Sequence, residues 1–300
     1  MKKLLLGVAA LATLAFTSCS DDDDTPSTSS LTLDISGLEN LGDEYRYEGW
    51  IILDDGPVST GTFSVDDSGA LSQISFPTNT AQLAAATNFV LSIEPNPDND
   101  PAPAATKILM GAFNGNSASV NSDNIVVDAT SSLGTLGASS GKFILATPTD
   151  MDDTNEDSGV WFLDNSSVSA AVGLQLPTLS AGWKYEGWAV INGTPVSTGT
   201  FTDASMADDN AATSPFKGTD GNGPGYPGED YLNGSAAGVT FPTSLKGATI
   251  VISVEPSPDN STAPFTLKPL AQPVAADADV HTAITMGAGP VAIISGSVSR

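Results

Sequence analysis

The side chains that could do acid–base chemistry are few and lie far apart in the sequence. His281 is the single histidine, and its Thr, Ala and Ile neighbours predict a strand, where a lone histidine more often has a structural role. We identify no serine nucleophile to pair with it. Glu48 and Glu186 fall in two similar stretches and resemble the carboxylate pair of a glycosidase. Each lies two residues before Trp50 or Trp188 on one strand face, which predicts a structural, hydrogen-bonded role. We therefore predict no catalytic residues and no enzyme activity.

Two acidic loops could supply oxygen ligands to calcium. They are residues 150–157 (DMDDTNED) and residues 220–230 (DGNGPGYPGED). The first has Asn155 where the EF-hand loop needs glycine and Trp161 where it needs glutamate, and the second has Pro224 and Tyr231 at ligand positions. Solvated loops are the favoured interpretation and structural calcium is the alternative. No other metal or cofactor is predicted.

The N-terminus has the features of an exported lipoprotein. Lys2 and Lys3 precede an apolar stretch over residues 4–16, which is shorter than the ~20 residues of a membrane-spanning helix and predicts a signal peptide over residues 1–18. Cys19 is the only cysteine, and its setting resembles a bacterial lipobox. We predict lipid attachment at Cys19, which leaves no disulfide; a free thiol after ordinary cleavage is the alternative.

A polar segment over residues 19–30 is the predicted tether, because it is too hydrophilic to pack. It contains four successive aspartates, and it resembles the acidic signal of Bacteroidetes-type surface lipoproteins; a plain spacer is the alternative. The localisation predicted is the cell envelope, as an outer-membrane lipoprotein. Whether it faces the periplasm or the outside stays open.

The charge of the chain restricts its partners. Removing residues 1–18 takes away two lysines and changes the formal net charge from −25 to −27. Such a chain is repelled by nucleic acid and by anionic membrane surfaces. We therefore predict no nucleic-acid partner, membrane contact only through the lipid, and an unknown protein or ligand at the envelope.

An internal duplication organises the rest of the chain. Residues 46–63 (RYEGWIILDDGPVSTGTF) match residues 184–201 (KYEGWAVINGTPVSTGTF) at eleven of eighteen positions. Residues 74–78 (ISFPT) then match residues 239–243 (VTFPT), and residues 88–99 match residues 249–260. The offset between the copies changes from 138 to 165 and then to 161. The second copy therefore carries an insertion over residues 202–238.

Short runs of aromatic and β-branched residues between turn residues predict an all-β fold: two tandem β-sandwich (Ig-like) domains of antiparallel strands. A helix is predicted only over residues 80–87. We expect the first module over residues 31–147, an acidic linker with a short strand over 148–167, and the second module over 168–300. Strands are predicted at residues 45–53, 58–65, 89–94, 107–113, 125–127, 142–146, 160–163, 185–191, 195–201, 250–255, 265–270, 281–286 and 291–298.

Both copies resemble the extracytoplasmic C-terminal domain of anti-sigma-K factors, over about two thirds of the chain that follows Cys19. In the first copy the residues that carry the resemblance are Tyr47, Glu48, Gly49, Trp50, Pro57, Thr60, Gly61, Phe63, Ile93, Glu94 and Pro95. In the second copy they are Tyr185, Glu186, Gly187, Trp188, Pro195, Thr198, Gly199, Phe201, Val254, Glu255 and Pro256. We interpret this motif as structural.

The resemblance implies a regulatory or signalling module outside the cytoplasm. The chain departs from the family pattern, because it shows neither a sigma-binding region nor an apolar segment after residue 16 that could span a membrane. We therefore expect a non-catalytic, lipid-anchored binding module. The alternative is a structural or adhesive surface lipoprotein whose acidic loops bind calcium. Because loops on rigid β scaffolds carry function, we expect the recognition surface in the insertion, at Tyr226, Glu229, Asp230 and Tyr231.

Overall fold

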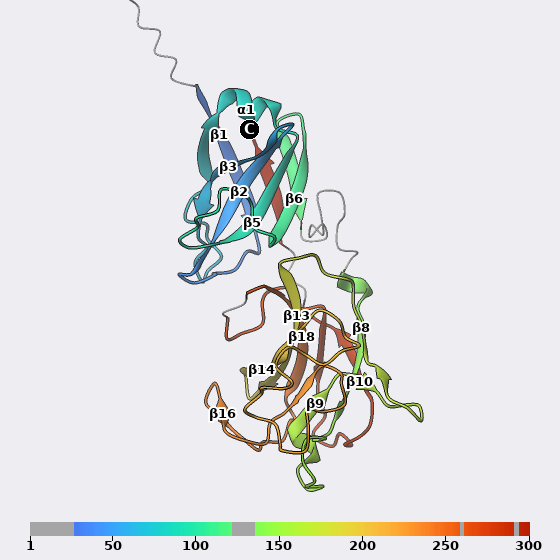
Figure 1. Ribbon diagram of the computed structural model, residues 1–300. Coiled ribbons are helices and arrows are strands. Elements are labelled where there is room, and N and C mark those ends of the chain that lie inside the picture. Colours follow the sequence, from blue (N-terminus) through green and yellow to red (C-terminus); the bar gives the residue numbers. More distant parts are fainter. Residues whose placement is uncertain (1–26, 122–135, 259–260, 291–293) are drawn as a thin grey trace, which may run out of the picture.

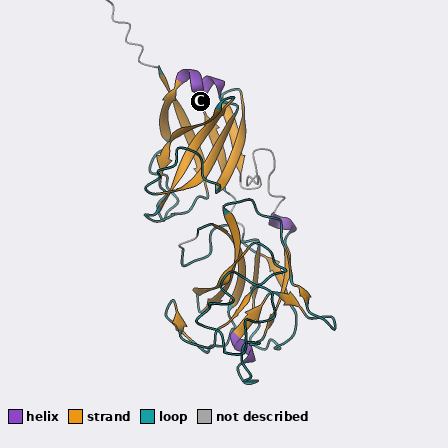
Figure 2. Cartoon of the chain, viewed as in Figure 1, coloured by secondary structure: helices purple, strands orange, loops and turns teal. Residues whose placement is uncertain are grey.

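The computed structural model describes residues 27–121, 136–258, 261–290 and 294–300 (Figure 1). Within these residues the regular structure is almost entirely antiparallel strand, with only short helices between the strands (Figure 2). The all-β prediction is confirmed. The signal peptide, Cys19 and the strand expected at residues 125–127 lie outside the described residues.

The first sheet contains eight strands, which include the expected Trp50 hairpin. Strands β3 and β4 at its two ends contact each other, so the sheet rolls up into a sandwich-like body. The members are β1 (Thr28–Ser36), β2 (Tyr45–Leu53), β3 (Gly56–Phe63), β4 (Ser75–Asn79), β5 (Asn88–Pro95), β6 (Lys107–Asn114), β7 (Ser117–Asn121) and β21 (Ser295–Ser299). They lie side by side in the order β3-β2-β5-β6-β7-β21-β1-β4.

The second sheet follows the same plan. The members of its main path are β8 (Ser140–Leu145), β9 (Gly159–Trp161), β13 (Trp183–Ile191), β14 (Thr194–Phe201), β15 (Gly228–Asp230), β18 (Thr249–Pro256), β19 (Leu270–Pro273) and β20 (Ile284–Ala288). Their order is β14-β13-β18-β19-β20-β8-β9-β15, and the ends β14 and β15 again touch. We call the two bodies the first module (residues 27–121 and 294–300) and the second module (residues 136–290).

Small elements complete the two modules. Helix α1 confirms the predicted helix, and its N-cap Asn79 accepts hydrogen bonds from the backbone N–H groups of Ala81 and Gln82. The remaining elements are α1 (Thr80–Ala85), the 3-10 turns η2 (Leu136–Ala138) and η3 (Glu156–Ser158), and the short strands β10 (Leu163–Asp164), β11 (Ala171–Val172), β12 (Leu174–Gln175), β16 (Ser235–Ala236) and β17 (Val239–Thr240).

The modules exchange one strand each. Matching the sheets position by position pairs β7 with β20, β21 with β8 and β1 with β9. Strand β8 is the last strand of the first repeat and β21 is the last strand of the second, and both begin with Ser-Gly. Each repeat therefore contributes its final strand to the sheet of the other. Figure 1 shows β21, in red, within the upper module.

Strand β21 is firmly held between β1 and β7. Val298 is fully buried, and a Cβ atom on Gly296 would lie only 2.0 Å from the backbone carbonyl oxygen of Asp34. The Arg300 guanidinium group donates hydrogen bonds of 2.7 Å to the carbonyl oxygens of Leu83 and Ala86. Close approach requires glycine at position 296, and the arginine fixes the end of the strand.

This pairing corrects the expected module boundaries. Residues 28–30 belong to β1 and not to the tether, residues 140–145 belong to the second module, residues 159–164 are strands of the second module, and residues 295–299 belong to the first. The local pattern identifies where strands form, but the partner of a strand is set by non-local pairing. The strand expected at residues 265–270 is also wrong, because β19 begins only at Leu270.

Most of the buried apolar side chains form one continuous cluster that includes residues of both modules, and a small second cluster lies around Trp161. On β2, Tyr47 and Ile51 belong to this cluster. Trp50 is buried but points to the opposite face together with Glu48, as strand alternation requires. Trp50 and Trp188 therefore lie on the outer faces of the β2 and β13 hairpins, and other side chains of the same strands face the core.

Candidate functional site

A buried polar chain recurs beside the tryptophan of each repeat. The Trp50 indole N–H donates to Ser92 Oγ at 2.8 Å, and Ser92 donates to the Glu94 carboxylate. Glu94 also accepts the backbone N–H of Ala104 at 2.8 Å. The second module repeats each contact with Trp188, Ser253, Glu255 and the backbone N–H of Phe265. In each module this series of hydrogen bonds links the tryptophan to the loop that follows the strand of the serine and glutamate.

The duplicated glutamates take part in the same outer layer. Glu48 accepts a hydrogen bond from Ser59, and Glu186 accepts one from Ser197. Burial raises the pKa of Glu48 and of Glu94, and the serine hydroxyls partly offset that increase. Glu48 and Glu186 lie in different modules, so they form no catalytic pair. Their contacts are those of buried carboxylates with hydrogen-bond donors.

The segment of the insertion in which we expected the recognition surface is buried in the second sheet, which corrects that expectation. Glu229, Asp230 and Tyr231 are all at least 97% buried. Tyr226 is half-buried, packs against the small cluster around Trp161, and donates its hydroxyl to the carbonyl oxygen of Ala170 at 3.1 Å. The Pro-Gly-rich sequence of this segment is typical of a loop, but Gly228–Asp230 pairs with β9.

Strand β15 takes the place in the sheet that β4 holds in the first module. Residues 239–243 are the sequence counterpart of β4, but they lie outside the main path of the second sheet. Their Phe241 ring packs against Phe216 and Tyr231 at centroid distances of 5.2 and 5.1 Å. The Tyr231 hydroxyl donates to the carbonyl oxygens of Val196 and Ser197. The insertion thus completes the second core.

Three carboxylates of the insertion are buried close together. Burial raises the pKa of Asp208 to about 6 and that of Glu229 to about 7, the neighbouring carboxylates adding to the shift at Glu229. Asp230 is fully buried but well satisfied, since it accepts from Thr149 and from the Trp161 indole at 2.6 Å. With its pKa at about 7, the Glu229 carboxyl group is partly protonated near neutral pH.

Within the described part of the chain, no serine nucleophile is placed beside His281. Its imidazole is 55% exposed and lies 3.3 Å from the Glu156 carboxylate. Residues 137–141 (GASSG) do contain the Gly-x-Ser-x-Gly spacing, with Ser139 at the centre. Ser139 precedes one end of β8, however, whereas the His281 backbone N–H bonds Leu145 at the other end. That separation, roughly 20 Å along a strand, prevents a dyad.

The two acidic loops lie against each other, because Asp220 N donates to the carbonyl oxygen of Thr149 at 2.8 Å. Asp152 accepts from Thr154, and Asp150 accepts from the Asn155 side chain at 2.9 Å. Among the described residues, no three Asp, Glu, His or Cys side chains form a group that could hold a metal ion. Within the same residues, no helix is both long and apolar enough to cross a membrane.

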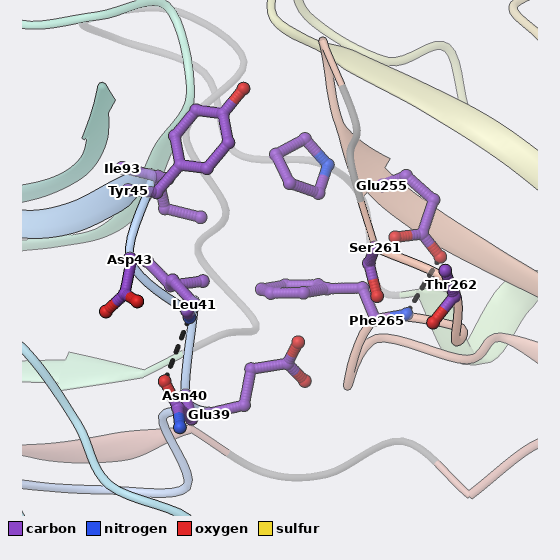
Figure 3. Close-up of a pocket in the computed structure, with 12 residues that line it drawn as sticks. Glu39, Asn40, Leu41, Asp43, Tyr45, Ile93, Glu255, Ser261, Thr262 and Phe265 are labelled. Atoms are coloured by element: carbon purple, nitrogen blue, oxygen red, sulfur yellow. Dashed lines mark hydrogen bonds between the residues drawn. The ribbon is translucent and has the colours of Figure 1, made fainter. Parts of the chain in front are cut away.

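A pocket lies where the two modules meet (Figure 3). We call it the junction pocket; its volume is about 280 Å³. Its lining residues are Glu39, Asn40, Leu41, Gly42, Asp43, Tyr45 and Ile93 from the first module and Glu255, Pro256, Ser261, Thr262 and Phe265 from the second. Sequence reasoning missed this pocket, because its two walls belong to different modules.

The junction around the pocket is closely packed. The Tyr45 hydroxyl donates to the carbonyl oxygen of Pro258 at 3.1 Å. A Cβ atom on Gly182, whose φ is +89°, would lie 2.8 Å from the backbone of Ala105 and Thr106 in the first module. Glycine at position 182 is therefore needed for the close approach of the two modules.

No family model, no curated protein and no solved structure matches the chain. The resemblance to anti-sigma-K domains therefore stays a prediction from the sequence.

Proposed function

We propose that the protein is a non-catalytic, lipid-anchored binding protein of the bacterial cell envelope, with a regulatory or signalling role like that of the anti-sigma domains it resembles. The observation that carries the proposal is the junction pocket, a hollow formed by side chains of both modules. As part of the proposal, each rolled sheet belongs to the Ig-like class, and the lipid on Cys19 is the membrane contact.

The fold supports a particular orientation on a membrane. Strand β1 begins at Thr28, at the end of the first module that lies away from the second (Figure 1). The eight residues from 20 to 27 can span at most roughly 28 Å. The first module would therefore lie next to the membrane, and the second module would be presented away from it.

The anchoring is tested by metabolic labelling of cells that make the full chain with an alkyne-tagged fatty acid. We expect label on the wild type and on Ser20→Ala, and none on Cys19→Ser. Protease treatment of intact cells then determines the face, because a surface protein is digested and a periplasmic one is protected. An unlabelled wild type, or label that persists in Cys19→Ser, would contradict lipid attachment. Turnover of any substrate that is lost in His281→Ala would contradict a non-catalytic role.

The second candidate function is a structural or adhesive surface lipoprotein stiffened by calcium. The contact between the two acidic loops at Thr149 and Asp220 favours it. Calcium that binds only the folded state must raise the melting temperature. A higher midpoint in millimolar calcium than in chelator, abolished by Asp150→Asn, would support this candidate, and identical curves would reject it.

A further inference from the structure

The junction pocket has one sign of charge. Among the described residues, all the charged side chains that line it are carboxylates, those of Glu39, Asp43 and Glu255, and neither lysine nor arginine lines it. The remaining lining combines the neutral polar side chains of Asn40, Ser261 and Thr262 with apolar and aromatic ones, and Leu41 and Phe265 face each other across the gap (Figure 3). Carboxylates beside an aromatic ring form a site that favours cations and repels anions.

The Phe265 ring of the pocket has no aromatic counterpart in the first copy. Phe265 donates its backbone N–H to Glu255 as Ala104 does to Glu94 in the first copy, so the two residues are equivalent. The Phe265 ring packs at 6.0 Å on Trp183 and is thereby held in place. The Glu39 carboxylate of the first module points into the same gap (Figure 3). The pocket therefore combines a fixed ring with a carboxylate that arrives from the other module.

Two cations lie near the pocket without lining it. Arg46 donates hydrogen bonds to the carbonyl oxygens of Gly42 at 2.9 Å and Tyr45 at 2.7 Å. Lys268 donates to the carbonyl oxygen of Phe265 at 2.7 Å and is close enough to Glu39 and Glu255 to interact with both. These two cations do not balance the three carboxylates of the lining, which keep one excess negative charge. The volume of about 280 Å³ is at the lower end of small-molecule sites, which favours a slender ligand.

We infer that the junction pocket binds the primary ammonium group of a slender alkylamine, with Glu39 as its charge partner and Phe265 as its apolar wall. The inference deepens the proposed binding function and rests on it. An ammonium group can come from a free polyamine or from a lysine side chain of a peptide, and these two sources are separated in the test.

The test measures binding by calorimetry to the full mature chain carrying Cys19→Ser, which needs no lipid. The probes are three molecules of equal chain length: 1,5-diaminopentane, the neutral 1,5-pentanediol and the anionic glutarate. We expect binding of the diamine alone, and weaker binding in high salt because the carboxylates are near the surface. A lysine peptide with blocked ends is then compared with the diamine. Tighter binding of the peptide would identify a peptide as the source of the ammonium group, and tighter binding of the diamine would identify a free polyamine.

Variants place the binding in the pocket. Glu39→Gln should weaken diamine binding about three- to fivefold, as expected for loss of one partly exposed ion pair. Thr262→Trp, at an exposed lining position, should block the pocket. Asp54→Asn makes the same charge change in the β2–β3 turn, at the other end of β2 from Tyr45, and should bind like the wild type.

Equal binding of the diol and the diamine, or equal weakening by Asp54→Asn and Glu39→Gln, would overturn the inference. So would unchanged binding in Thr262→Trp. Circular dichroism melts of each variant show whether it is folded. An unfolded Glu39→Gln is replaced by Glu39→Ala, and an unfolded Thr262→Trp by Thr262→Phe. Because this protein carries no lipid, failure of diamine binding leaves the labelling result at Cys19 standing, and failure of labelling leaves the binding result standing.

Discussion

The serine in each Trp–Ser–Glu chain joins two buried groups that would otherwise lose a partner. Ser92 is fully buried, and Glu94 is 1% exposed. The indole N–H and the carboxylate both need the serine hydroxyl. The free-energy cost of an unsatisfied buried group exceeds the net gain from an ordinary hydrogen bond. The same Trp–Ser–Glu hydrogen bonds therefore occur in both modules as a structural unit.

Ser92→Ala should lower the free energy of unfolding by about 1–3 kcal/mol, because it leaves the Trp50 N–H without its acceptor. The measurement is urea unfolding followed by tryptophan fluorescence. Ser253→Ala is the matched variant in the second module and should cost a similar amount, with additive effects in the double variant. If Ser92→Ala unfolds at the same urea concentration as the wild type, the Trp50–Ser92–Glu94 hydrogen bonds contribute nothing to stability.

The buried carboxyl group of Glu229 makes stability depend on pH. Its folded pKa of about 7 lies above its ordinary value of 4.5, so the folded state keeps a proton that the unfolded chain has released. Its contribution is fully present below about pH 4.5 and is lost as the pH rises to about 7, an effect of up to roughly 3 kcal/mol.

Glu229→Gln stays neutral at every pH and should therefore gain stability over the wild type between pH 4.5 and 7. Thermal melts across that range measure the difference, with the exposed Asp54→Asn as the control for loss of one negative charge. Parallel curves for Glu229→Gln and the wild type would contradict the raised pKa.

Among the elements, the exchanged strands have the largest effect on the fold. Strand β21 pairs on both sides, with β1 and with β7, so its absence leaves two open edges in the first module. Burial of Val298 alone contributes about 1.5–3 kcal/mol. Unpaired strand edges are also templates for aggregation.

Deleting residues 294–300 should speed amide hydrogen exchange in β1 and β7 and leave β13 and β18 protected. Hydrogen exchange read by mass spectrometry checks this. A synthetic peptide of residues 294–300 should restore protection, and the same peptide with Gly296→Val should not, because the added side chain would meet the Asp34 carbonyl. Unchanged exchange after the deletion would show that β21 is dispensable.

The β2–β3 and β13–β14 hairpins could be predicted from the sequence, and the exchange of β8 and β21 between the modules could not. The β2 and β13 stretches carry aromatic and β-branched residues around clear turns, and β2 has the predicted bounds Tyr45–Leu53. Strand β8 shares only its opening Ser-Gly with β21, and no local pattern tells which sheet a strand joins. Strand β15 was hidden because Gly228 and its Pro-Gly neighbours are typical of a turn.

At the scale of the whole molecule, the exchanged strands and the continuous core join two repeats into one body. Tandem modules with few contacts between them are expected to move and unfold separately. Here the apolar cluster includes residues of both sheets, and Gly182 lies against the backbone of Ala105 and Thr106. The junction pocket follows from that packing, which is why a search of each repeat alone does not find it.

We expect the described fold to unfold in one calorimetric transition, with equal calorimetric and van't Hoff enthalpies. Gly182→Val should separate the transition into two, because its side chain would push the modules apart. Gly234→Val also places a side chain at a positive φ, of 74°, but meets nothing within 4 Å. Two transitions in the wild type, or the same splitting in Gly234→Val, would contradict this account.

The exchange also sets an order of events during synthesis. Residues 136–290 are contiguous and precede β21, so the second module has all its strands before β21 is made. The first module, although it is made earlier, lacks this strand until residues 294–300 appear. The gap between β1 and β7 must therefore stay open while the whole second module is made, and residues 294–300 then complete the module that began first.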